Sequence, residues 1–143
     1  MPNRIVHNII ADRPPLLLGE HDTVVNAVDL MTRHLQGAVM IVRDERLVGI
    51  FTERDLMNRV VLQRRDPATT RLAEVMTREP RSVTPQHRFG YALHLMHAHG
   101  YRHMPVTEAG RPIGMVSLRD VLGSEKLDFE KELEFLEHVA EVL

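Results

Sequence analysis

The sequence contains no cysteine and no tryptophan, and none of its apolar runs approaches the ~20 residues needed to cross a bilayer. Without cysteine the chain can form no disulfide, so it has no use for an oxidising compartment. Its first residues also lack the basic segment followed by an apolar segment that marks a secretory signal. We therefore expect a cytoplasmic protein with no membrane partner.

Charge is unevenly distributed along the chain. The net charge is −2, but residues 125–143 hold seven acidic residues and two lysines, which leaves +3 on the remainder. That small excess comes with no basic cluster interleaved with aromatic residues, so we expect no nucleic-acid partner. A length of 143 residues with 43% hydrophobic and 27% charged residues predicts a soluble globular protein built around one shared hydrophobic core.

One short stretch occurs twice. Gly49–Asp55 reads Gly-Ile-Phe-Thr-Glu-Arg-Asp, and Gly114–Asp120, 65 residues later (114 minus 49), reads Gly-Met-Val-Ser-Leu-Arg-Asp. Each copy is typical of a buried strand that ends at a hydroxyl residue and enters a helix carrying an aspartate three residues later. The spacing holds without a gap, which predicts two tandem copies of one supersecondary unit.

The hydrophobic pattern predicts the order strand, helix, strand, strand, helix in each copy. In the first copy the predicted elements are a strand at 16–18, a helix from residue 23, strands at 38–42 and 47–51, and a helix at 53–61. The second copy repeats this order, with its first strand at 82–83. The predicted fold class is α+β, with repeats at residues 5–63 and 72–123, a linker at residues 64–71 and a C-terminal helix at residues 124–143.

The C-terminal helix is predicted to be amphipathic. Ser124 can cap its start, and apolar residues follow at steps of four and three, namely Phe129, Leu133, Leu136, Ala140 and Leu143. Two interpretations stay open. The apolar stripe packs on the helix's own domain, or it contacts another subunit.

The duplicated turn brings together groups that suit a small ligand. A hydroxyl, the free N–H groups of a helix start and a carboxylate would surround one small volume, supplied by Thr52 and Asp55 in the first copy and by Ser117 and Asp120 in the second. A carboxylate can accept two hydrogen bonds from a vicinal diol such as a ribose, and the helix start suits a phosphate. The alternative is structural, with the hydroxyls capping helices and the acids complementing the helix dipole. An arginine before each aspartate, Arg54 and Arg119, favours a ligand site.

From about residue 5 to residue 123 the sequence resembles the tandem cystathionine-β-synthase (CBS) domain pair, also called the Bateman module. The residues that carry the resemblance are Gly49–Asp55, Gly114–Asp120, Tyr101–Val106 and the Val75-Met76-Thr77 opening of the second half. The resemblance implies two repeats packed about a pseudo-twofold axis, with two clefts that bind AMP, ADP, ATP or another adenosine-containing ligand. In such modules the aspartate binds the ribose, which implies that role for Asp55 and Asp120 and places Thr52 and Ser117 beside them.

The two copies differ at the positions that resemble the family's basic pair. Arg102-His103 occupies them in the second repeat, and Gly37-Ala38 in the first. In similar modules this pair reaches across to phosphates bound beside the other repeat's aspartate. The resemblance therefore implies that Arg102 and a protonated His103 serve the Asp55 cleft, while the Asp120 cleft receives no charge from Gly37-Ala38. We expect the two clefts to differ in affinity.

Catalysis and metal binding have little support in the sequence. There is no glycine-rich phosphate loop, no Gly-x-Ser-x-Gly elbow and no cysteine nucleophile. The nine histidines lack the spacing of a metal site, and no acid lies between Arg88 and Val106. We therefore expect no enzyme activity, no catalytic cofactor and no metal.

Two functions follow as hypotheses. The first is a regulatory module that binds an adenine nucleotide and transmits its occupancy to a homodimer or to a downstream protein target. Its candidate ligand-binding residues are Thr52, Arg54, Asp55, Arg102, His103, Ser117, Arg119 and Asp120. The alternative is an interaction module whose pockets have degenerated and which dimerises or docks through its last helix.

Overall fold

The computed structural model describes residues 4–142, apart from the side chains of residues 122–131. The first half of the chain contains α1 (Val6–Ile10), β1 (Leu17–Gly19), α2 (Val24–His34), β2 (Ala38–Arg43), β3 (Arg46–Thr52), α3 (Glu53–Asp55) and a π-helical turn, η1 (Leu56–Val61). The second half contains α4 (Leu72–Val75), β4 (Thr77–Arg78), α5 (Phe89–His99), β5 (His103–Glu108), β6 (Arg111–Ser117) and α6 (Arg119–Val142). The fold class is α+β, as predicted.

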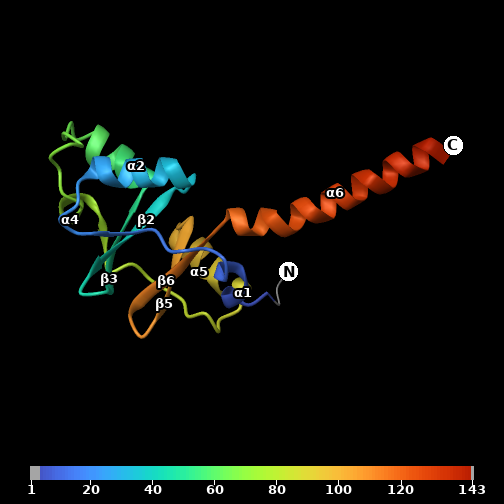
Figure 1. Ribbon diagram of the computed structural model, residues 1–143, viewed down its shortest axis with the longest axis horizontal. Helices are drawn as coiled ribbons and strands as arrows, with labels where there is room; N and C mark the ends of the chain where they lie inside the picture. The colour runs from blue at the N-terminus through green and yellow to red at the C-terminus, as the bar shows by residue number, and fades with distance from the viewer. Residues whose placement is uncertain (1–3, 143) are drawn as a thin grey trace.

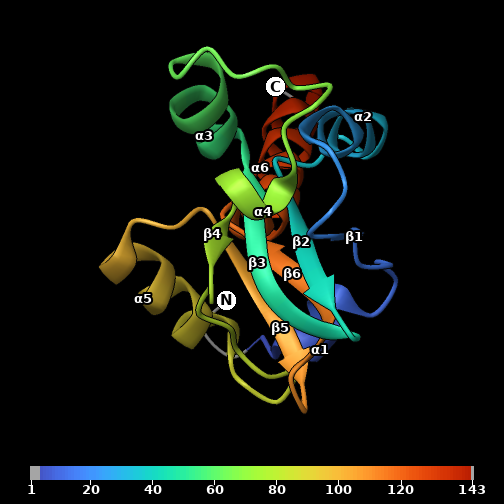
Figure 2. The same cartoon turned by 90° about the vertical axis from the view of Figure 1, so that its left-hand side faces the viewer.

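Two antiparallel hairpins form the centre of the molecule. The β2–β3 hairpin lies in a four-stranded sheet of order β1-β2-β3-β4, and β5–β6 forms a second sheet. Both hairpins turn through two residues with positive φ, Asp44 (50°) with Glu45 (65°) and Ala109 (52°) with Gly110 (81°). Turns of this kind match the right-handed twist of paired strands. Figure 2 shows the two hairpins side by side, and Leu47 N donates to Gly110 O at 3.0 Å where they meet.

The first strand is unequal in the two repeats. In the first repeat β1 pairs in parallel with β2 over three residues. In the second repeat the strand predicted at 82–83 is reduced to one parallel bridge between Val83 and Val106. Pro80 and Pro85 flank this segment, and a proline lacks the N–H that a strand needs for its ladder.

The predicted single core is wrong, because the buried residues form two clusters, and each includes a segment from the other half of the chain. One cluster is built on the first repeat and includes Leu72, Val75 and Met76 from the start of the second half. The other is built on the second repeat and includes Val6, Ile9 and Ile10 of α1. Neither repeat therefore completes its core without the other.

The two motif glycines permit this exchange. A Cβ at Gly114 would lie 2.9 Å from Cβ of Ile10, and one at Gly49 would lie 2.4 Å from Sδ of Met76. The repeated glycine thus has a structural reason, which is close approach of a segment from the other half of the chain.

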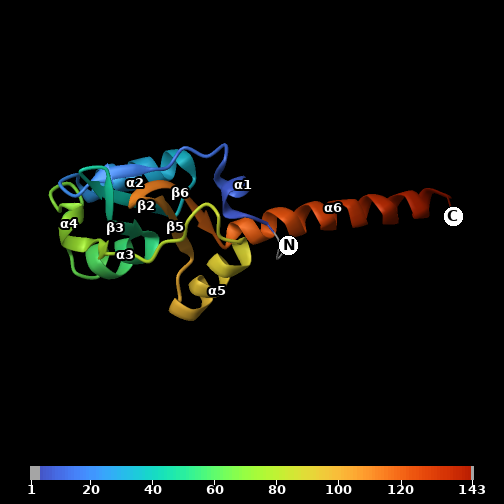
Figure 3. The ribbon, with the colours of Figure 1, turned by 90° about the horizontal axis from the view of Figure 1, so that it is seen from below.

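The C-terminal helix is present but begins earlier than predicted. α6 runs without a break from Arg119 to Val142, so the aspartate of the second motif lies in its first turn, and Ser124 is inside the helix. Gly123 weakens a helix interior by about 1 kcal/mol relative to alanine, which is too little to end a long helix. Figures 1 and 3 show α6 leaving the rest of the protein and pointing into solvent.

Candidate functional site

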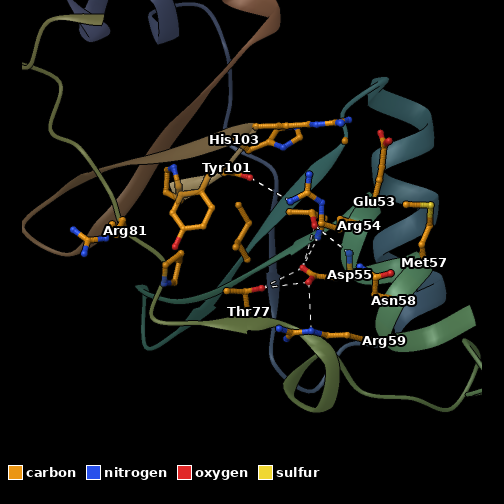
Figure 4. A pocket seen from close by; sticks show the side chains of 17 residues that line it. Glu53, Arg54, Asp55, Met57, Asn58, Arg59, Thr77, Arg81, Tyr101 and His103 are labelled. Carbon is orange, nitrogen blue, oxygen red and sulfur yellow. Dashed lines mark hydrogen bonds and ion pairs between the residues drawn. The ribbon is translucent and has the colours of Figure 1, made fainter. Parts of the chain in front are cut away.

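A cavity of about 450 Å³ lies between the two repeats, beside the first copy of the motif (Figure 4). One wall comes from the end of β3, α3 and η1, and the other from residues 77–81 and 100–105. Its lining residues are Gly37, Ile50, Thr52, Glu53, Arg54, Asp55, Met57, Asn58, Arg59, Thr77, Pro80, Arg81, Gly100, Tyr101, Arg102, His103 and Pro105. The volume falls within the range of small-molecule sites, about 300–1,000 Å³.

Asp55 is a buried carboxylate in this cavity, with 7% of the residue exposed. Its Oδ2 accepts from the Thr52 backbone N at 3.0 Å and from Thr52 Oγ1 at 3.1 Å, while the Asp55 backbone N donates to Thr52 Oγ1 at 3.2 Å. These bonds form a capping box, so the structural interpretation of the motif holds.

The other oxygen of Asp55 has longer contacts. Oδ1 accepts from Thr77 Oγ1 at 3.3 Å, and Arg59 Nε lies 3.6 Å away. A carboxylate oxygen has two lone pairs, so Oδ1 keeps capacity for a donor from a ligand. Capping and ligand binding are therefore compatible in one side chain, because they use different oxygens.

The two motif arginines connect the repeats. Arg54 Nη1 donates to Gly100 O at 3.2 Å, and Arg119 Nη1 donates to Leu35 O at 3.0 Å. Gly100 (φ 70°) and Leu35 (φ 53°) are the left-handed residues that end α5 and α2. Each arginine thus bonds the helix end of the opposite repeat, as a pseudo-twofold relation requires. This contact explains why an arginine recurs in both copies without invoking a ligand.

Arg102 and His103 line the same cavity as Asp55. Gly37 makes room for His103, since a Cβ at position 37 would lie 3.1 Å from its ring and 2.7 Å from Glu53 Oε1. Burial lowers the pKa of His103; Arg119 and Arg102 act in the same direction, against Glu53 and Asp120. The lowered pKa disfavours the protonated His103 that the resemblance implies, so the positive charge in the cavity comes from its arginines.

Twelve of the seventeen lining residues were not among the predicted site residues, and Asn58, Arg59 and Arg81 are three of the polar ones. Arg59 follows Asp55 by four residues on one helix, which places the two side chains on one face, and this spacing could have identified it. Arg81 is exposed and lies on the segment after β4, where the sequence has no periodic pattern.

The second copy of the motif is arranged differently. Ser117 lines a separate cavity of about 200 Å³ together with Asp12, Arg13, Pro14, Pro15, Leu16, His34, Gln36 and Met115. Asp120 is buried, with 6% of the residue exposed, and its Oδ1 pairs with Arg13 Nη2 at 2.5 Å. Arg119 does not line this cavity and instead lines a third hollow with Leu35 and Glu53.

The structure thus separates the predicted site residues. Thr52, Arg54, Asp55, Arg102 and His103 line one cavity, Ser117 lines a second cavity and donates its backbone N–H to Asp120, and Arg119 lines neither. The expectation that Gly37 serves the second cleft is wrong, since Gly37 lines the Asp55 cavity, and the charged side chains at the Ser117 cavity are Asp12 and Arg13.

Within residues 4–121 and 132–142, whose side chains the structure describes, no group of three or more His, Asp or Glu side chains is placed to hold a metal ion. In the same part of the chain, no helix combines the length and apolar character needed to cross a membrane.

Two interlocked repeats, each built on a β-hairpin, with a cavity between them beside the first motif, define a tandem two-repeat module. The chain belongs to the CBS domain family, which it matches over residues 6–62 and 72–125. It is 37% identical over 120 residues to the mitochondrial CBS domain-containing protein CBSX3 of Arabidopsis thaliana, covering 80% of this chain and 58% of that protein. The chain thus spans little more than half of that relative.

Solved structures of CBS proteins share the fold. One with CBS domains from Burkholderia ambifaria MC40-6 is 34% identical, with a TM-score of 0.77 over 87% of this chain and 95% of the other. The CBS domain protein PAE2072 from Pyrobaculum aerophilum, complexed with AMP, is 25% identical, with a TM-score of 0.74 over 81% and 88% of the two chains. The resemblance to a tandem CBS pair is confirmed; the domain limits and the roles of the site residues stay predictions.

Proposed function

We propose that this chain is a regulatory module whose Asp55 cavity binds an adenosine nucleotide of the AMP, ADP or ATP class. The observation that carries the proposal is the cavity itself, which sets a buried carboxylate with one available oxygen in the same space as Arg102 and Arg81. AMP in the complex of PAE2072, a protein of the same fold, supports the choice of ligand class.

Each part of a nucleotide has suitable groups in the cavity. Oδ1 of Asp55 is available to the ribose hydroxyls, with Thr77 beside it. Ile50, Met57, Pro80 and Tyr101 offer apolar surface for a base. Arg102 can grip a phosphate through two parallel N–H bonds, and the neutral ring of His103 offers a further donor.

Calorimetry with AMP, ADP, ATP and GMP tests the proposal. We expect the adenine nucleotides to bind and Asp55→Ala to weaken binding by about 1.5–3 kcal/mol, roughly tenfold to a hundredfold in Kd. Asp120→Ala is the matched control, because it removes a buried helix-starting carboxylate from the other repeat. Absence of heat with every nucleotide at millimolar concentration would contradict the proposal.

Regulation requires that the nucleotide distinguish two arrangements of the protein or of a complex. The interlocked cores and the arginine bonds between repeats provide a route, because a ligand that contacts both Asp55 and Arg102 touches both repeats at once. We expect nucleotide to change the dissociation constant of a dimer or of a complex with a target protein, which sedimentation with and without AMP measures.

A second candidate function is an interaction module that pairs through α6. Its specific support is exposure of large apolar side chains on one helix: Leu133, Phe135, Leu136, Val139 and Val142 are 37–73% exposed. Sedimentation of the full chain against a chain ending at residue 124 tests it. The two candidates are compatible, because the cavity and α6 are separate parts of the molecule.

A further inference from the structure

The two aspartates of the duplicated motif have the same local role and different neighbours. Each accepts a hydrogen bond from the backbone N–H three residues earlier, at 3.0 Å from Thr52 to Asp55 and at 2.8 Å from Ser117 to Asp120. The second oxygen distinguishes them. Oδ1 of Asp55 has contacts of 3.3 Å or longer, whereas Oδ1 of Asp120 pairs with Arg13 Nη2 at 2.5 Å.

The segment before the first strand holds Arg13 in place. Arg13 N donates to Ile10 O at 3.0 Å, and Pro14 and Pro15 follow directly. A residue before proline is restricted to extended backbone, which limits where the side chain can reach. Arg4, from the same segment, donates through Nη1 to the backbone O of Asp120 at 2.9 Å, so two guanidinium groups hold the start of α6.

The equivalent arginine of the second repeat bonds a backbone carbonyl and not a carboxylate. Arg78 stands 65 residues after Arg13 (78 minus 13), and its Nη2 donates to Ala73 O at 2.7 Å.

The cavity at Asp55 has a volume of about 450 Å³. The cavity at Ser117 has about 200 Å³, which is below the usual range for ligand sites. Arg13 lines the small cavity, and its side chain is 44% exposed.

We propose that Arg13 closes the Asp120 cleft, so that the chain binds one nucleotide, at the Asp55 cavity, and not two. This inference rests on the proposed function for the identity of the ligand. Ribose hydroxyls are neutral donors, and they would have to replace a guanidinium whose charge-assisted bond to a carboxylate is roughly twice as strong. Removing Arg13 from Asp120 would also leave a buried carboxylate without its ion-pair partner, which opposes opening. Arg13 is therefore a specificity-determining residue that makes two similar clefts unequal.

Binding stoichiometry measured by equilibrium dialysis with radiolabelled AMP tests this closure. We expect one AMP per chain for the unmodified protein and two for Arg13→Ala, which frees Oδ1 of Asp120 and enlarges the cavity. Arg13→Gln keeps most of the side-chain volume without the charge, and it should also admit a second AMP, with lower affinity than Arg13→Ala. Arg78→Ala is the matched control, the same substitution at the equivalent position, and it should leave the stoichiometry at one.

A double variant locates the second AMP. Arg13→Ala with Asp55→Ala should retain one AMP, bound at the Asp120 cleft. Two AMP per unmodified chain would overturn the closure, and so would a stoichiometry of one in folded Arg13→Ala and Arg13→Gln. If the unmodified chain binds none but Arg13→Ala binds one, the closure stands and the proposed function of the Asp55 cavity is wrong. If neither binds any, both are wrong.

Discussion

Asp55 and Asp120 show how neighbours decide what a repeated residue can do. Both are buried and both begin helices through the same backbone bond, so the motif that contains them predicts one local structure. Their difference comes from Arg59, Thr77 and Arg13, which lie 4, 22 and 107 residues away along the chain. The contacts of Thr77 and Arg13 are long-range, and such contacts leave no periodic signal in a sequence.

His103 makes stability depend on pH. Burial lowers its pKa in the folded protein, so below the unfolded value of about 6.5 the unfolded chain binds more protons than the folded one. The contribution of the neutral ring is therefore fully present above about pH 6.5 and is lost as pH falls towards the folded pKa. We expect urea denaturation to show a smaller loss of stability between pH 7.5 and 5.5 for His103→Gln than for the parent. An equal loss in both would assign the pH dependence to other groups.

The motif glycines should tolerate a methyl group unequally. An added Cβ at Gly114 would meet the branched Cβ of Ile10 at 2.9 Å, which is fixed close to the backbone of α1. At Gly49 it would meet the end of the Met76 side chain, which can rotate away. We expect Gly114→Ala to cost about 1–3 kcal/mol of unfolding free energy and Gly49→Ala less, both measured by urea denaturation. An equal loss of unfolding free energy in the two variants would contradict this prediction, because it would mean that Ile10 and Met76 move aside equally easily.

At the scale of elements, the sequence predicts the helices and strands that have a local signal or that recur in both repeats. The helix starting at Thr23 and both hairpins are confirmed, because each has its own hydrophobic period or turn residues. The helix predicted at 53–61 is present as α3 followed by the π-helical η1, and the second motif helix is the start of α6. The exchange of α1 and α4 between the two cores was not predicted. Short apolar segments such as Val6–Ile10 fit either core by composition, and only the packing selects one.

The candidate site was likewise predictable only where its residues belong to a repeated or recognised motif. The repeat identifies Thr52 and Asp55, and the resemblance implied that Arg102 and His103 lie beside them, as the cavity lining has them. Arg13 was not predicted as a partner of Asp120, because one arginine in a proline-containing turn has no distinguishing pattern. The lowered pKa of His103 also depends on burial, which the sequence alone does not give.

The arginine bonds between repeats allow structural and ligand roles to be separated. Arg119 bonds the end of α2 and lies outside the Asp55 cavity, so Arg119→Ala should lower the unfolding free energy by about 0.5–1.5 kcal/mol, towards the lower end because the bond is exposed. The Kd for AMP should stay within about twofold of the parent value. Urea denaturation and calorimetry on the same sample measure both. A large loss of AMP affinity without a loss of unfolding free energy would contradict this prediction and would mean that Arg119 contacts the ligand.

At the scale of the whole molecule, α6 is the element whose C-terminal part is not covered by the two repeats. Along residues 132–142 every residue is exposed, and the stretch contains four glutamates and no lysine or arginine. Leu133, Leu136 and Ala140 recur at steps of three and four, while Glu134 and Glu141, seven residues apart, share another face. Of the two interpretations open from the sequence, packing of this stretch on its own domain is wrong. An apolar face flanked by acids instead fits a contact between copies in which the leucines meet and the glutamates stay in water.

That contact predicts a homodimer that depends on the leucines of α6 and not on its glutamates. We expect the 16.4 kDa chain to sediment as a dimer at micromolar concentration, and Leu133→Ser with Leu136→Ser to shift it to monomer. Both leucines are exposed in the single chain, 42% and 57%, so their loss should leave the unfolding free energy of the monomer nearly unchanged. Glu134→Ser with Glu141→Ser, on the other face of the same helix, is the matched control and should remain dimeric. A dimer that survives the leucine changes would place the interface on the body of the repeats, and a parent chain that sediments only as monomer would refute the dimer.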